Sequence, residues 1–104
     1  MIPAMSYTRP LFVALLLSAT AAQADPPADA VAIDQRAALD CVTARYRGEP
    51  LRIRDEDDGF VQEVRWRTPS GNVLKIELTG PGCRFIEVDG VGQAPARILP
   101  GQSQ

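Results

Sequence analysis

The sequence predicts an α+β domain in which one N-terminal helix packs on a four-stranded antiparallel meander sheet. Two observations carry this prediction: a helical apolar stripe comes first, and four short segments of alternating apolar and polar residues follow it. A third observation is the cysteine pair, Cys41 in the helix and Cys83 at the start of the last strand. A disulfide between them would clamp the helix across the sheet.

The first 24 residues have the pattern of a secretory signal peptide. Arg9 supplies a positive charge, residues 11–17 form an uncharged apolar run, and residues 22–24 (AQA) match an A-x-A cleavage site. The run is too short to span a bilayer, so we expect cleavage after Ala24 and a periplasmic or secreted protein. Loss of Arg9 changes the formal net charge from −2 to −3. Without a basic stripe, neither a nucleic acid nor an anionic membrane surface is expected as a partner. No stable membrane insertion is expected after cleavage of the signal peptide.

The predicted helix covers residues 35–47. Asp34 is a suitable N-cap, and Gly48 is a natural residue to follow the C-terminus. Residues 25–33 contain two prolines and no usable period, so they are predicted to form a flexible leader. The apolar stripe of the helix, with members three, four and eight positions after the first, consists of Ala38, Cys41, Val42 and Tyr46.

Four strands are predicted, at residues 50–54, 63–67, 73–78 and 83–88. The turns between them carry Asp58-Gly59, Pro69 to Asn72, and Gly80 to Gly82, which are residue types that reverse the chain. The predicted domain therefore spans residues 34–90. Residues 91–104 lose the period and are predicted to form an irregular tail.

The two cysteines predict a disulfide, because an even cysteine count in a small exported domain is most simply a bridge. Closing a loop of about 43 residues would stabilise the fold by about 4 kcal/mol in the chain-entropy model. A thiol-redox pair is the alternative, and it would favour C-x-x-C spacing with a cation nearby. A bridge also suits the size of the domain, since a core below roughly 80 residues is marginal alone.

No catalytic, cofactor or metal site is predicted, and the chain is not expected to be an enzyme. Histidine is absent, so no nucleophile–base pair can be written. The acidic run 55–58 fails as an EF-hand loop, because its fifth position is Gly59 and its twelfth is Trp66. The carboxylates of the strands are expected on polar faces, paired with basic residues of neighbouring strands; they are Glu63, Glu77 and Glu87.

Four arginines remain as a candidate partner-binding face. They occupy alternating positions on two neighbouring strands, so they can share one sheet face, with Trp66 on the other face or near the rim. Arginine and tryptophan are residues that interfaces favour. The alternative is a solvated outer face opposite a core that contains Trp66. The four residues are Arg52, Arg54, Arg65 and Arg67.

The order of these motifs resembles the PepSY domain, a small exported module, over roughly residues 34–88, which is most of the chain expected after cleavage. The shared features are an aromatic-x-Gly helix end (46–48), a strand (51–53), an E-V-x-W/V strand (63–66), a Thr-Pro-x-Gly turn (68–71), an alternating strand (73–78) and a Gly-led last strand. The family usually carries an Asp and a Thr-Gly before that last strand, where this sequence has Thr79 and Pro81-Gly82.

The resemblance implies a non-catalytic domain, of the kind found in propeptides of thermolysin-type peptidases and as stand-alone periplasmic proteins with an inhibitory or regulatory role towards peptidases. We therefore expect an exported module that binds a protein or peptide partner in the cell envelope. One alternative is a small-ligand or metal-binding envelope protein. A second alternative is a thiol-redox enzyme.

Overall fold

The computed structural model describes residues 25–102, and this part of the chain is an α+β fold with one longer helix and four strands. The elements in chain order are α1 (Gln35–Arg45), β1 (Glu49–Glu56), the 3-10 turn η1 (Asp57–Gly59), β2 (Val61–Arg67), β3 (Val73–Thr79), β4 (Arg84–Asp89) and α2 (Gln93–Ala96). The predicted signal peptide, residues 1–24, lies outside the described residues. Within the described residues, no helix has the length and apolar character needed to cross a membrane.

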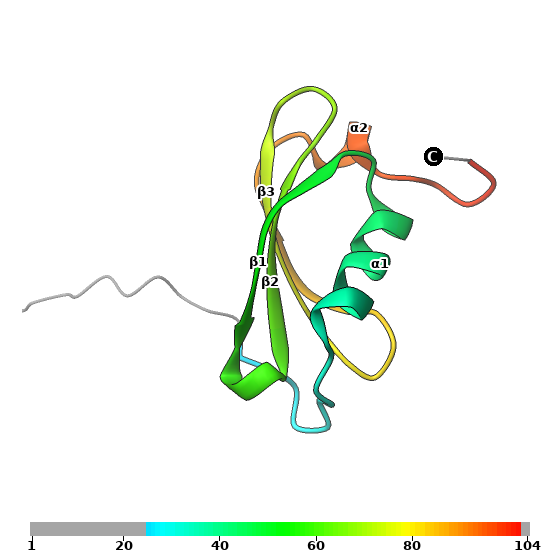
Figure 1. The fold of residues 1–104 in the computed structure, drawn as a ribbon. Helices are drawn as coiled ribbons and strands as arrows, with labels where there is room; N and C mark the ends of the chain where they lie inside the picture. Colours follow the sequence, from blue (N-terminus) through cyan, green and yellow to red (C-terminus); the bar gives the residue numbers. More distant parts are fainter. Residues whose placement is uncertain (1–24, 103–104) are drawn as a thin grey trace, which may run out of the picture.

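The strands form one antiparallel sheet in the order β1-β2-β3-β4, which is the predicted meander (Figure 1). The register places Val64 opposite Ile76 and Trp66 opposite Leu74, so the apolar residues of β2 and β3 share one face. α1 lies across that face (Figure 1). The second face has no helix over it within residues 25–102.

α1 begins and ends where the local backbone chemistry requires it. Asp34 Oδ1 accepts a 2.7 Å hydrogen bond from the backbone N–H of Ala37, which is the predicted N-cap. The helix ends at Arg45, two residues before the predicted end. Tyr46 is already extended, because its backbone forms an isolated β-bridge with Arg97.

The core lies between α1 and the sheet. The helical stripe predicted from the sequence is buried, with Ala38 and Val42 fully inaccessible and Tyr46 3% exposed. Burial of a large apolar side chain contributes roughly 1.5–3 kcal/mol. The sheet contributes five such side chains, all at most 1% exposed: Val64, Trp66, Leu74, Ile76 and Leu78.

The predicted disulfide joins Cys41 in the middle of α1 to Cys83 just before β4. Their Cα atoms are 5.6 Å apart and their sequence separation is 42 residues. The bond therefore closes a loop that includes β1, β2 and β3. In the chain-entropy model, closing such a loop is worth about 4 kcal/mol.

The segment predicted to be a flexible leader is partly built into the fold. The backbone of Val31 exchanges two 2.9 Å hydrogen bonds with Gly80, and Ile33 is 8% exposed within the core. Asp29 forms a 3.1 Å ion pair with Arg84. This corrects the start of the domain from residue 34 to about residue 31, because the leader fills the end of the sheet beside β3.

The predicted irregular tail is also corrected, since residues 93–98 are ordered against α1. α2 buries Ala96, which is 2% exposed, and the Ala96 carbonyl accepts a 2.8 Å hydrogen bond from the backbone N–H of Arg47. The backbone N–H of Ile98 donates to the Arg45 carbonyl at 2.8 Å. A helix of four residues is too short to leave a hydrophobic period in the sequence.

Replacing both cysteines by serine (Cys41→Ser and Cys83→Ser) should lower the free energy of unfolding by up to about 4 kcal/mol, because the unfolded chain regains the freedom of the closed loop. Urea unfolding followed by circular dichroism measures the loss. Reduction of the wild-type protein should give the same loss, and the double variant should not respond to reductant. Equal stability of oxidised and reduced wild-type protein would contradict the prediction.

Candidate functional site

The candidate site is the sheet face turned away from α1, where alternate residues of β1 and β2 place four arginines. The register puts Arg52 directly opposite Arg65, with Arg54 and Arg67 two positions along each strand. All four side chains therefore project from one face, which we call the arginine face. Arg65 is half-buried and the other three are exposed.

Trp66 points to the opposite face and is not part of this surface. It is 1% exposed, and its indole Nε1 donates a 2.9 Å hydrogen bond to the Arg47 carbonyl. The neighbouring Gly48 has a φ of 132°, and a Cβ there would lie 2.6 Å from Trp66 Nε1 and 2.1 Å from the carbonyl oxygen of Arg67. Trp66 therefore anchors the connection between α1 and β1 and cannot contact a partner.

Glu63 is the centre of the ordered charges on the arginine face. Its side chain is 3% exposed; Oε2 accepts a 2.8 Å hydrogen bond from Arg65 Nε, and Oε1 accepts a 3.1 Å bond from Arg54. Burial acts to raise the pKa of Glu63, but the hydrogen bonds from Arg65 and its other partners outweigh burial, so the pKa lies below its usual range. Charge-assisted bonds of this kind fix both guanidinium groups.

The sequence did not reveal that this face buries a row of carboxylates. Glu63, Glu77 and Glu87 lie directly opposite one another across β2, β3 and β4, and Glu77 is fully buried. Carboxylates in direct opposition repel, so the row requires cations. Lys75 supplies one, with its Nζ 3.4 Å from Glu77 and 3.9 Å from Glu87. Arg84 takes no part in the row, because it pairs with Asp29.

Glu56 of β1 joins this row as a third member of a tight carboxylate group. One oxygen each of Glu56, Glu63 and Glu77 lies within 4.8 Å of the others. Burial, followed by a hydrogen bond with Glu63, raises the pKa of Glu56. Such oxygens suit a hard divalent cation. The cations Arg54, Arg65 and Lys75 lie against the same group in this structure. The group is therefore a carboxylate cluster compensated by basic side chains.

β1 forms an open edge on the same side of the molecule. It pairs with β2 and with no other strand of residues 25–102, and nearly all its residues are exposed. Pro50 and the irregular register between Pro50 and Arg52 interrupt the first part of this edge, a feature that prevents uncontrolled strand pairing. From Arg52 to Glu56 the register is continuous. Arg52 forms no ion pair with any residue that the structure describes.

Comparisons with protein-family models, with curated proteins and with solved structures gave no match to this chain. The functional interpretation therefore depends on the geometry of the chain itself. Two features dominate the candidate site. The buried Glu63 holds two arginines in place, and β1 forms an open edge of the sheet beside them.

Glu56→Gln should raise the free energy of unfolding near neutral pH by about 0.5–1 kcal/mol, because it removes one of the clustered carboxylates and keeps the side-chain shape. The pKa of Glu56 is raised in the folded state, so the wild-type penalty is present above that pKa and disappears below the ordinary value of 4.5. The advantage of the variant should therefore vanish as the pH falls. Urea unfolding at several pH values measures this difference.

Glu49→Gln is the matched control for that experiment, because Glu49 lies in the same strand but is exposed and pairs only loosely with Arg67 at 3.8 Å. It should give no gain at neutral pH, as exposed ion pairs contribute little. A Glu56→Gln protein that is less stable than wild type at neutral pH would show that the repulsion described here is not the dominant interaction.

Proposed function

We propose that the chain is an exported, non-catalytic binding module, similar to the PepSY domain, whose partner is a protein or peptide of the cell envelope. Restraint of a peptidase is the form of this role that the resemblance implies. The observation that carries the proposal is the pre-ordered arginine face beside the open edge of β1. The disulfide supports export, since such bonds persist in oxidising compartments.

The binding mode that fits this geometry is strand addition. An extended segment of the partner would pair with residues 52–56 of β1 through backbone hydrogen bonds, which give affinity without demanding a particular sequence. Every second side chain of the added strand would then lie on the arginine face, close to Arg52 and Arg54. Opposite charges in such cross-strand positions contribute roughly 0.2–1 kcal/mol each. The preferred partner is therefore an extended segment with acidic residues at alternate positions.

Glu63 lowers the conformational cost of binding at this surface, compared with four mobile arginines. Ordering a long side chain on binding costs roughly 0.5–1.5 kcal/mol. Arg54 and Arg65 are already held by Glu63 before any partner arrives, so that cost is met within the free domain. Arg52 remains available for a carboxylate of the partner, since it has no ion pair among the described residues.

Charge reversal of Arg52 (Arg52→Glu) should reduce capture of the partner at least tenfold, because it places a like charge opposite the acidic segment and breaks no ion pair within the described fold. The measurement is quantitative capture by the disulfide-bonded protein from an extract of the cells that produce it. Hydrogen exchange of the captured complex should show new protection of the backbone amides of residues 52–56.

Arg36→Glu is the matched control. Arg36 lies on α1, its side chain is 86% exposed, and its change alters the net charge by the same amount. Capture by this variant should equal that of the wild-type protein. Capture that survives Arg52→Glu, together with unchanged exchange of the β1 amides, would remove the arginine face and the β1 edge from the proposal.

A further inference from the structure

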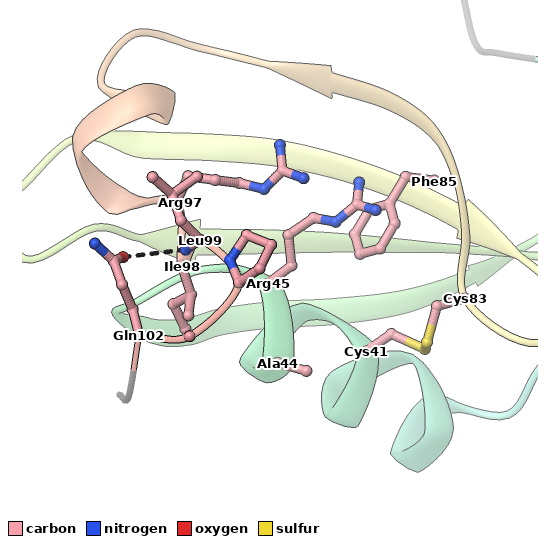
Figure 2. Close-up of a pocket in the computed structure, with 11 residues that line it drawn as sticks. Cys41, Ala44, Arg45, Cys83, Phe85, Arg97, Ile98, Leu99 and Gln102 are labelled. Carbon is pink, nitrogen blue, oxygen red and sulfur yellow. Dashed lines mark hydrogen bonds between the residues drawn. A yellow bond between two sulfur atoms is a disulfide. The ribbon is translucent and has the colours of Figure 1, made fainter.

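A second surface feature lies on the other side of the sheet, where a shallow pocket of about 470 Å³ opens between α1, β4 and the segment 97–102 (Figure 2). The Cys41–Cys83 disulfide forms one end of the pocket. The other end is formed by the segment that returns from α2 to α1, where Tyr46 and Arg97 form their β-bridge. The pocket is widely open to solvent, and its volume is in the range of small-molecule sites.

Two arginines from different elements line this pocket. Arg45 projects from the last turn of α1, and its guanidinium carbon lies 3.8 Å from the centroid of the Phe85 ring. Arg97 lies over Tyr46, at 5.9 Å from that ring centroid. The two rings pack edge to face with centroids 6.5 Å apart. Figure 2 shows both guanidinium groups extending to the same side of the pocket.

The aromatic contacts hold these cations without consuming their hydrogen-bond donors. A guanidinium over a ring face is attracted by the ring quadrupole, while its N–H groups stay in the guanidinium plane. Arg47 adds to the rigidity, since it donates to the Arg97 carbonyl at 3.3 Å and to the Gln102 side chain at 3.1 Å. The segment that carries Arg97 is therefore fixed to the end of α1.

Neither Arg45 nor Arg97 has a carboxylate partner among residues 25–102. Five other arginines of the described chain each form an ion pair: Arg36, Arg54, Arg65, Arg67 and Arg84. Arg47 and Arg52 also form none within this part of the chain, but of the four only Arg45 and Arg97 line this pocket. The protein as a whole carries a formal net charge of −2, so the two cations of the pocket are not the consequence of a basic surface. Two like charges that line one pocket are both stabilised by an anion placed between them.

The rest of the pocket wall is largely apolar, with contributions from Phe85, Ile98, Leu99 and Pro100. Guanidinium groups bind carboxylate and phosphate oxygens with matched, bidentate geometry. We infer that this pocket binds a small organic anion, with a carboxylate or phosphate group held by Arg45 and Arg97 and an apolar part against Phe85 and Leu99. The inference is independent of the proposed partner, because the arginine face lies on the opposite side of the sheet.

The test is titration of the disulfide-bonded protein with four probes, followed by NMR shifts of the pocket amides and the arginine Nε–H groups. Benzoate and phenyl phosphate carry an oxyanion beside an apolar ring, inorganic phosphate carries the oxyanion alone, and benzyl alcohol carries the ring alone. Saturable shifts at the pocket are expected for benzoate or phenyl phosphate, and the tighter of the two identifies the oxyanion. Binding should weaken as salt is added.

Arg45→Gln and Arg97→Gln should each lower the affinity about tenfold, the loss expected for one charge-assisted hydrogen bond. Arg97 is exposed, so its replacement tests the pocket without placing the core at risk. Arg36→Gln, on the exposed side of the same helix as Arg45, should leave the affinity unchanged.

No saturable shift for benzoate or phenyl phosphate at tens of millimolar would overturn the inference. Equal affinity in wild type and in Arg97→Gln would overturn it as well. If inorganic phosphate binds as tightly as phenyl phosphate, the inference that the ligand has an apolar part is wrong. If benzyl alcohol binds as tightly as the anions, the role of the two arginines is wrong. None of these outcomes bears on capture of a protein partner through Arg52.

Discussion

The contact on which this small fold depends is the one between α1 and the sheet, held at one side by packing and at the other by a covalent bond. Ala38, Val42 and Tyr46 pack in the core with β2 and β3, while the Cys41–Cys83 bond fixes the same helix to the start of β4. A domain of roughly 80 residues or fewer buries too little apolar surface to be secure on packing alone. In the chain-entropy model the disulfide adds about 4 kcal/mol of stability, and the bond sets the position of the helix relative to the last strand.

The two sides of the sheet differ in how their charged side chains are paired. On the face without a helix, Glu63 and Glu77 are buried and are compensated inside the molecule by Arg54, Arg65 and Lys75. On the helix side, aromatic rings hold Arg45 and Arg97 without a carboxylate from the described residues. Arg52, on the face without a helix, also has no ion pair among the described residues. The proposed partner site and the proposed anion site therefore lie on opposite sides of one domain.

Much of the architecture could be predicted because it depends on periods that the sequence displays. The alternation around Leu74 and Ile76 predicted their common face, and the spacing of Ala38, Cys41 and Val42 predicted the buried side of the helix. Alternation could not predict that Glu63 and Glu77 would be buried, because it assigns a residue to a face and not to a degree of exposure.

The segments outside these periods were harder to predict. Ile33 and Ala96 lie in short segments that have no hydrophobic period of their own. They are buried by tertiary contacts, which the sequence does not display. The Arg45–Arg97 pocket was missed for the same reason. Its two cations are 52 positions apart in the sequence numbering and meet only because residues 93–98 return to the end of α1.

The disulfide links the stability of the domain to its second binding site. Cys41 and Cys83 line the same pocket as Arg45 and Phe85, so the bond that holds α1 against β4 also sets the distance between the helix that carries Arg45 and the strand that carries Phe85. Opening it would free that side of the pocket. The arginine face depends instead on the backbone ladder between β1 and β2 and on Glu63, which the sulfur atoms do not touch. Loss of the bond would therefore act on the pocket directly, and on the arginine face only through the stability of the whole domain.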